Sequence, residues 1–173
     1  MAGGYHEDRF SLGSKTKSHI YNFYYWQYID IFIYFSHHRV TIPPPGWIEA
    51  AHKNGVKILA TFITEWEPGR KENLLLMEDC ISVDFEKMEF ADKLIEIAKF
   101  YKFDGWFFNF EAEIKPEHVP VMEKFLKYMT SKCHKEIPDS MVLWYDSVTR
   151  DGSLKWQNML NEQNKLYVLF FFH

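Results

Sequence analysis

The stretch Phe103–Ile114 reads FDGWFFNFEAEI, an almost wholly apolar run that carries an amide at Asn109 and a carboxylate at Glu111. Side chains alternate between the two faces of a strand, so Phe107, Asn109 and Glu111 share one face. The opposite face carries the aromatic residues Trp106, Phe108 and Phe110. A buried carboxylate is costly unless it is paired or used. The stretch therefore predicts a buried strand whose polar pair has a structural partner or a chemical task.

Strand and helix patterns alternate on both sides of this stretch. Four more segments have the length and the β-branched or aromatic content of strands, namely 28–35, 56–64, 141–145 and 166–172. Helical spacing or helix-start signals predict helices over 47–54, from about 84 to 101, over 116–135 and over 154–164. The proline-rich tract 41–46 and the polar segment 65–69 are expected to be loops. Apolar strands separated by helices indicate a parallel sheet covered by helices.

The parallel sheet leaves a choice between an open doubly wound fold and a (β/α)8 barrel. No glycine-rich phosphate-binding motif follows any predicted strand, which removes the commonest nucleotide-binding reason for the open sheet. Polar residues gather instead where successive strands end: His37, His38, Glu65, Asn109, Glu111, Tyr145 and Asp146. Barrel enzymes keep their chemistry at this end of the strands. The sequence therefore favours the α/β class and the TIM (β/α)8 barrel family.

Composition excludes several classes of function. The 173 residues fit one domain, and 47% hydrophobic residues suffice for a core. A net charge of −4 argues against nucleic acid or an anionic membrane surface as partner. Two distant cysteines, Cys80 and Cys133, predict neither a zinc site nor a disulfide framework. The first residues lack a signal-peptide pattern and no apolar run is long enough to span a membrane, so we expect a soluble, intracellular chain.

Four separated motifs resemble glycoside hydrolase family 85, the endo-β-N-acetylglucosaminidases of the cytosolic animal type. They are YIDIFIYFSHHRVTIPPPGW, GVKILATFITEW, FDGWFFNFE and VLWYDSVTRDGSLKWQNMLN, and they agree in order and spacing. The resemblance covers nearly the whole chain. It implies a TIM-barrel catalytic domain in the cytosol that cleaves the bond between the two N-acetylglucosamines (GlcNAc) of N-linked glycans. The implied partner is a glycan or glycoprotein substrate, with no cofactor or metal.

The resemblance also implies a role for each member of the polar pair. In substrate-assisted glycosidases the 2-acetamido oxygen of the sugar attacks the anomeric carbon, so no carboxylate nucleophile is needed. Asn109 would hold the acetamide, and Glu111 would be the general acid and then the general base. Tyr145 would help to position the same acetamide. The i,i+2 spacing directs Asn109 and Glu111 at one sugar.

Further contacts are expected around this pair. By resemblance, Trp156 borders the acceptor side of the cleft. Glu65 and Asp146 are candidate substrate contacts, although ion pairs at the barrel rim explain them equally well. His37 and His38 suggest a metal site, but adjacent residues on a strand face opposite ways, so one site would hardly use both.

The ends of the chain carry a separate expectation. Compared with the eight strands of the family barrel, residues 1–173 correspond to the second to sixth strands, and the first, seventh and eighth are missing. We therefore expect an incomplete barrel of about five parallel strands alternating with helices. The alternative to an active enzyme is a catalytically inactive truncated fragment that only binds glycan or is unstable.

Overall fold

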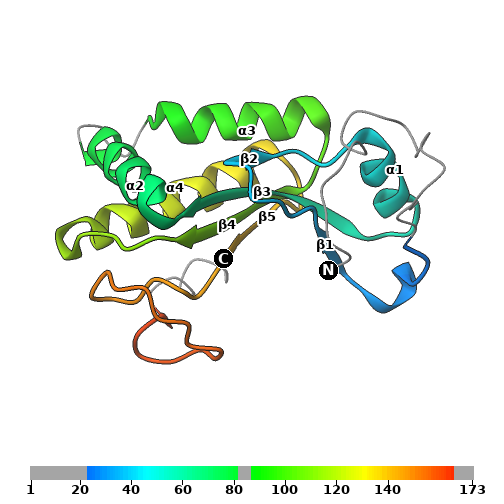
Figure 1. Ribbon diagram of the computed structural model, residues 1–173. Helices are drawn as coiled ribbons and strands as arrows, with labels where there is room; N and C mark the ends of the chain where they lie inside the picture. The colour runs from blue at the N-terminus through cyan, green and yellow to red at the C-terminus, as the bar shows by residue number, and fades with distance from the viewer. Residues whose placement is uncertain (1–22, 82–86, 166–173) are drawn as a thin grey trace.

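The computed structural model describes residues 23–81 and 87–165, which form a parallel sheet with helices packed against it (Figure 1). The strands are β1 (Ile31–Ile33), β2 (Val40–Thr41), β3 (Lys57–Glu65), β4 (Gly105–Glu111) and β5 (Met141–Trp144). The α-helices are α1 (Pro45–Lys53), α2 (Trp66–Ile81), α3 (Glu89–Tyr101) and α4 (Val119–Glu136). Short 3-10 helices cover Trp26–Tyr28 and Pro116–His118. None of the helices within the described ranges combines the length and apolarity needed to cross a membrane.

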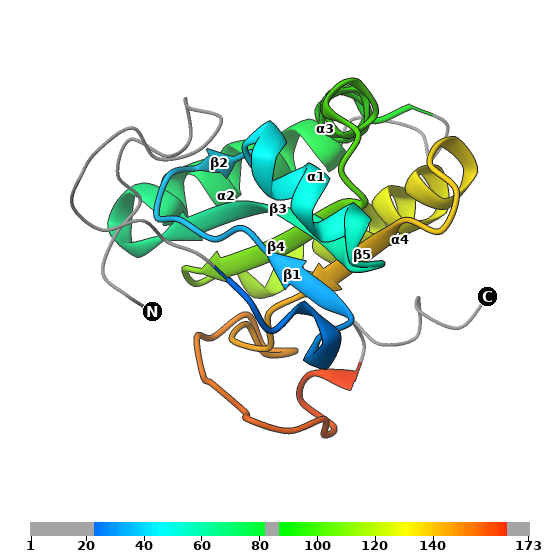
Figure 2. The same cartoon turned by 90° about the vertical axis from the view of Figure 1, so that its right-hand side faces the viewer.

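The sheet has the parallel order β1-β3-β4-β5, and β2 adds an antiparallel pairing to β3. Residues 31–33 of β1 pair with the first part of β3, and β2 pairs with Thr61 and Phe62 further along the same strand. Helices α3 and α4 lie against one face, and the segment after β5 lies on the side of the sheet opposite α3 (Figures 1 and 2). The α/β class with a parallel sheet is therefore confirmed.

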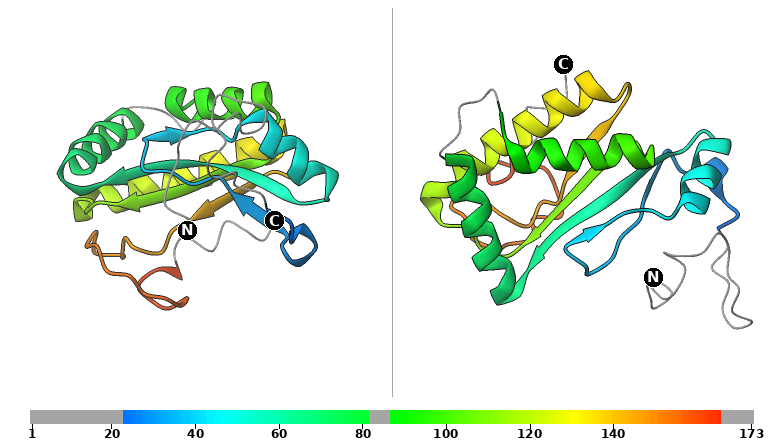
Figure 3. Two further views of the ribbon diagram at one scale, coloured as in Figure 1. Left: turned by 45° about the vertical axis from the view of Figure 1, so that its right-hand side comes forward. Right: turned by 90° about the horizontal axis from the view of Figure 1, so that it is seen from above.

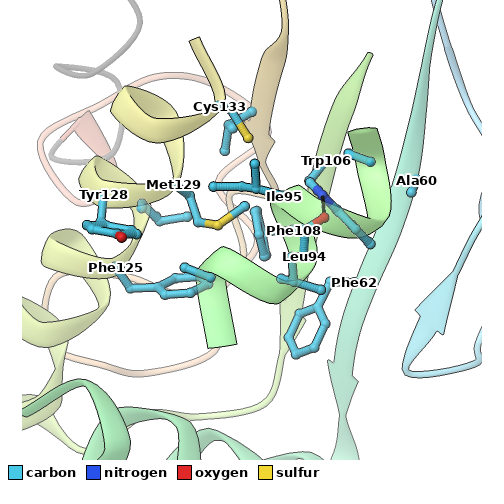
Figure 4. Close-up of a cluster of buried hydrophobic side chains, with 14 of the residues drawn as sticks. Ala60, Phe62, Leu94, Ile95, Trp106, Phe108, Phe125, Tyr128, Met129 and Cys133 are labelled. Carbon is cyan, nitrogen blue, oxygen red and sulfur yellow. Dashed lines mark hydrogen bonds between the residues drawn. The ribbon is translucent and has the colours of Figure 1, made fainter. Parts of the chain in front are cut away.

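The core lies between the sheet and helices α3 and α4. Trp106, Phe108 and Phe110 of β4 are fully buried in it, as the alternation of the strand predicted. Figure 4 shows this packing, with side chains of β3, β4, α3 and α4 in contact: Ala60, Phe62, Leu94, Ile95, Trp106, Phe108, Phe125, Tyr128, Met129 and Cys133. The Trp106 indole donates a hydrogen bond to the Leu94 carbonyl at 3.1 Å, so its one polar atom is satisfied within the core.

Helix α2 corrects the expectation of a polar loop over 65–69. The helix begins at Trp66, directly after β3 ends at Glu65, and it lies across the carboxyl ends of the strands (Figure 3). Pro68 falls in the first turn of α2, where a missing N–H leaves no helical hydrogen bond unmade. The buried residues of α2 follow helical spacing: Gly69, Asn73, Leu76, Met77 and Cys80.

Two other expectations differ from the structure. The strand expected over 28–35 is confined to Ile31–Ile33, after which the chain turns and returns as β2. The helix expected over 154–164 is instead an irregular segment with turns, because asparagine side chains bind its backbone. Asn164 Oδ1 accepts from the Asn161 N–H at 2.8 Å, and Asn161 Oδ1 accepts from the Gln163 N–H at 2.7 Å. The strand expected over 166–172 lies outside the described residues.

Gly105 opens β4 where only glycine fits. Its φ is +141°, and a Cβ built there would lie 1.8 Å from the Met141 carbonyl oxygen of β5. We expect Gly105→Ala to lower the free energy of unfolding by at least about 2 kcal/mol, because backbone strain and a clash add at one residue. Urea unfolding of the purified chain measures this. Gly46→Ala in α1 is the control, since a Cβ placed there would meet no atom within 4 Å and alanine favours helix.

Candidate active site

The carboxyl ends of β3, β4 and β5 bring the predicted polar side chains to one face of the sheet. Glu65 and Glu111 are register partners on β3 and β4, and both face away from the α3 and α4 core. Tyr145 follows β5, and its backbone N–H donates to the Phe108 carbonyl at 3.0 Å. Its ring meets Phe107 edge to face with centroids 6.3 Å apart, which places it on the same face as Asn109. Three neighbouring strands thus converge on one small area.

Asn109 and Glu111 are in direct contact. Asn109 Nδ2 donates a hydrogen bond to Glu111 Oε1 at 3.2 Å, and Asn109 is only 2% exposed while Glu111 is partly open to solvent. The Asn109 Oδ1 atom is buried without a hydrogen-bond partner among the described residues. A buried acceptor without a partner is costly, and such groups in native proteins are commonly reserved for a ligand or a water. The pair therefore presents a carboxylate beside a buried amide oxygen that accepts no hydrogen bond within the described residues.

Tyr145 is kept neutral by its surroundings. Burial raises the pKa of the Tyr145 hydroxyl most, and the negative charges of Glu111 and Asp146 raise it further. A hydrogen bond with Trp156 acts in the opposite direction. The phenol thus remains a hydrogen-bond donor well above neutral pH. Asp146, Trp156 and Glu111 therefore all interact with Tyr145, and the Trp156 side chain is 52% exposed.

Glu65 has a partner that sequence reasoning did not assign. His37 Nδ1 lies 3.0 Å from Glu65 Oε2, and the Glu65 side chain is only 11% exposed, whereas that of His37 is 53% exposed. The backbone N–H of His38 donates to Ser36 Oγ at 3.0 Å. Within the described ranges no group of three or more His, Cys, Asp or Glu side chains is placed to hold a metal ion. The position of His37 at the end of its predicted strand was the available signal.

Gly69 allows α2 to approach this end of the sheet. A Cβ at Gly69 would lie 2.8 Å from the Thr64 carbonyl carbon and 3.2 Å from Ala112 Cβ, next to Glu65 and Glu111 respectively. Asn73 of the same helix donates from Nδ2 to the Ala112 carbonyl at 3.3 Å. Helix α2 therefore fixes the backbone that carries both glutamates.

Comparison with known proteins identifies the family. Residues 5–170 match the family described as Glycosyl hydrolase family 85. The chain belongs to glycosyl hydrolase family 85. A mouse family 85 relative named cytosolic endo-beta-N-acetylglucosaminidase is 49% identical over 168 residues, which are 96% of this chain and 22% of the relative. A human relative of the same name is 46% identical over 96% of this chain and 22% of its own length.

More distant family 85 proteins match over the same region. The Arabidopsis thaliana protein named cytosolic endo-beta-N-acetylglucosaminidase 2 is 42% identical over 95% of this chain and 23% of its own length. The crystal structure of the glycoside hydrolase domain of Endo-D from Streptococcus pneumoniae R6 superposes with a TM-score of 0.69 at 25% identity, covering 88% of this chain and 25% of that chain.

These matches establish the fold of the chain and show how much of its relatives it spans. The fold is that of part of a family 85 barrel, which confirms the predicted barrel family. The chain spans about a fifth of the length of the curated relatives it matches. The assignment of its strands to the second to sixth barrel positions stays a prediction.

Proposed function

We propose that this chain carries the catalytic centre of an endo-β-N-acetylglucosaminidase that acts in the cytosol. The substrate class is the GlcNAc-β1,4-GlcNAc core of N-linked glycans and free oligosaccharides. The names of the relatives support the activity and the location. The observation that carries the proposal is the contact between Asn109 and Glu111, together with an Asn109 Oδ1 that has no partner in residues 23–81 and 87–165.

The first step forms a cyclic intermediate from the substrate itself. The acetamido oxygen of the sugar attacks the anomeric carbon, the glycosidic bond breaks, and Glu111 gives its proton to the departing oxygen. Asn109 Oδ1 accepts from the acetamido N–H, and this hydrogen bond orients the attacking oxygen and stabilises the positive charge that develops on the amide. The Tyr145 hydroxyl donates to the same acetamide. An amide suits this place because it accepts a hydrogen bond without competing as a nucleophile.

The second step returns the sugar and the enzyme to their starting forms. Glu111, now ionised, removes a proton from a water molecule that attacks the anomeric carbon and opens the intermediate. The acetamide is restored and the configuration at the anomeric carbon is retained overall. We assign to Glu65, which pairs with His37, and to Asp146 contacts with sugar hydroxyls beside the reacting ring. Trp156 borders the acceptor sugar through its contact with Tyr145.

The test compares this chain with a chimera in which it replaces the 168-residue matching segment of the mouse relative. Both are incubated with a high-mannose glycopeptide, and mass spectrometry detects the peptide that retains one GlcNAc. Release by the chimera is the expected result, and its absence from a folded chimera would overturn the proposal. Release by the chimera with binding alone by this chain would support the alternative that residues 1–173 bind glycan without turnover.

Tyr145→Phe tests the hydroxyl in the chimera. We expect kcat/KM for the glycopeptide to fall about tenfold, because one hydrogen bond worth about 1.4 kcal/mol is lost from the transition state. The ring and its contact with Phe107 remain, and the lost hydrogen bond is to Trp156, whose side chain is 52% exposed, so the melting temperature should change little. Tyr101→Phe, at the end of α3, is the matched control. An unchanged kcat/KM in the Tyr145 variant would remove the hydroxyl from the mechanism.

A further inference from the structure

Trp66 combines two unusual properties at the rim of the proposed site. It is the first residue of α2, directly after Glu65, and its side chain is 73% exposed. Its backbone has φ of +55°, in the left-handed region. The other non-glycine residues with positive φ in the described ranges are polar: Lys102, Asp139 and Asn158. All four residues are exposed, so Trp66 is the exception in residue type: it is the one large apolar side chain among them.

Neither packing nor backbone geometry explains a tryptophan here. The left-handed conformation is unfavourable for bulky residues and is suited to glycine or asparagine. A large apolar side chain that stays exposed to water contributes little hydrophobic stabilisation to the fold. The sharp turn at Trp66 leads the chain directly from β3 into α2, and Gly69 leaves room for α2 to pack against Thr64. Strained residues of this kind concentrate at ligand-binding sites.

The position of Trp66 supplies the second part of the argument. Strands β3 and β5 flank β4 on opposite sides. Trp66 follows Glu65, the register partner of Glu111, on the β3 side, whereas Trp156 contacts Tyr145 on the β5 side. Two exposed tryptophans thus belong to the chain segments on either side of β4, the strand that carries Glu111. An enzyme that cleaves an internal glycosidic bond has to bind sugars on both sides of that bond.

We infer that Trp66 is a substrate-binding residue that stacks against a sugar ring on the non-reducing side of the scissile bond. The inference rests on the proposed function, in which Trp156 borders the acceptor side. The flat indole covers the apolar face of a pyranose ring and removes both surfaces from water. A mannose-bearing glycan supplies such rings beyond the GlcNAc held by Asn109.

The two reaction products separate the two sides in a binding experiment. Binding is measured by calorimetry with the Glu111→Gln chimera, because this experiment needs no hydrolysis of the ligand. One ligand is the released mannose-containing glycan ending in GlcNAc, and the other is the peptide carrying a single GlcNAc. Trp66→Asn removes the ring and suits the left-handed backbone. Trp66→Phe retains an aromatic face, and Leu75→Asn changes another exposed apolar residue of α2.

We expect Trp66→Asn to weaken binding of the released glycan about tenfold and to leave the GlcNAc peptide within about twofold. Trp66→Phe should retain most of the affinity for the glycan, and Leu75→Asn should change the affinity for neither ligand. Trp156→Ala should instead weaken binding of the GlcNAc peptide. Unchanged glycan binding by Trp66→Asn, or equal losses for both ligands, would overturn the inference. Because binding is scored without turnover, the two proposals fail separately. If the chimera with Glu111 unchanged binds the glycan but does not hydrolyse the glycopeptide, only the proposed function is contradicted.

Discussion

Glu111→Gln is expected to abolish hydrolysis of a high-mannose glycopeptide by the chimera. Loss of a general acid and base costs about 10²–10⁴ in rate, and more where protonation of the leaving group is essential. The carboxamide keeps the size of the side chain, so binding of the intact glycopeptide should stay within about tenfold. Glutamine also retains an oxygen that can accept from Asn109 Nδ2, as Glu111 Oε1 does at 3.2 Å. Mass spectrometry of the released peptide and calorimetry measure the two quantities.

Glu113→Gln is the matched control for this variant. Glu113 lies two residues further along the same segment, its side chain is 52% exposed, and it pairs with Arg70 at 2.9 Å. An exposed ion pair contributes little to stability, so this change should alter neither turnover nor the melting temperature measurably. Near-normal turnover by Glu111→Gln would remove Glu111 as the general acid, and an equal loss in Glu113→Gln would indicate a general charge effect.

Asn109→Ala is expected to lower glycopeptide hydrolysis by about 10² while leaving the reaction of a preformed sugar oxazoline intact. The amide acts while the cyclic intermediate forms, and removing one well-placed polar group from a transition state costs about 10²–10³. A synthetic oxazoline bypasses that step. Glu111 then only has to activate the incoming water or acceptor. Parallel assays of glycopeptide hydrolysis and oxazoline consumption measure the difference.

A double variant completes this experiment. Asn109→Ala combined with Glu111→Gln should consume neither substrate, because no base remains for the second step. Thermal unfolding of each variant is required, since Asn109 is buried and alanine leaves a small cavity. If Asn109→Ala hydrolyses glycopeptide normally, or rejects the oxazoline as completely as the glycopeptide, the proposed division between the two residues is wrong.

The sequence predicted those parts of the fold that depend on local alternation. The two faces of β4 follow directly from the period of a strand, so Phe108 and Asn109 were correctly placed on opposite faces, and the structure shows that the face of Phe108 meets the core. The gathering of Glu65, Glu111 and Tyr145 follows from a second simple rule, because parallel strands end at a common edge. Neither prediction needed a contact between distant residues.

The features that sequence reasoning missed depend on tertiary contacts. Pro68 and Gly69 are typical of a loop, but here proline lies in the first helical turn and glycine permits close packing against Thr64. The contact of His37 with Glu65 joins residues 28 positions apart, so no local pattern shows it. Asn164 lies in a stretch whose sequence pattern predicted a helix, yet its side chain binds backbone atoms of a turn.

The direct junction between β3 and α2 makes the two sides of the site unequal in their tolerance of sequence change. Helix α2 begins at Trp66 with no connecting residues, and Gly69 is held against Thr64, so an insertion here would shift Glu65. The segment that follows β5 and carries Trp156 is irregular and is held by turns, and such segments accept changes in length. Under the proposed function, differences in acceptor preference between relatives should therefore arise in the segment that carries Trp156. The junction between β3 and α2 at Trp66 should keep its length.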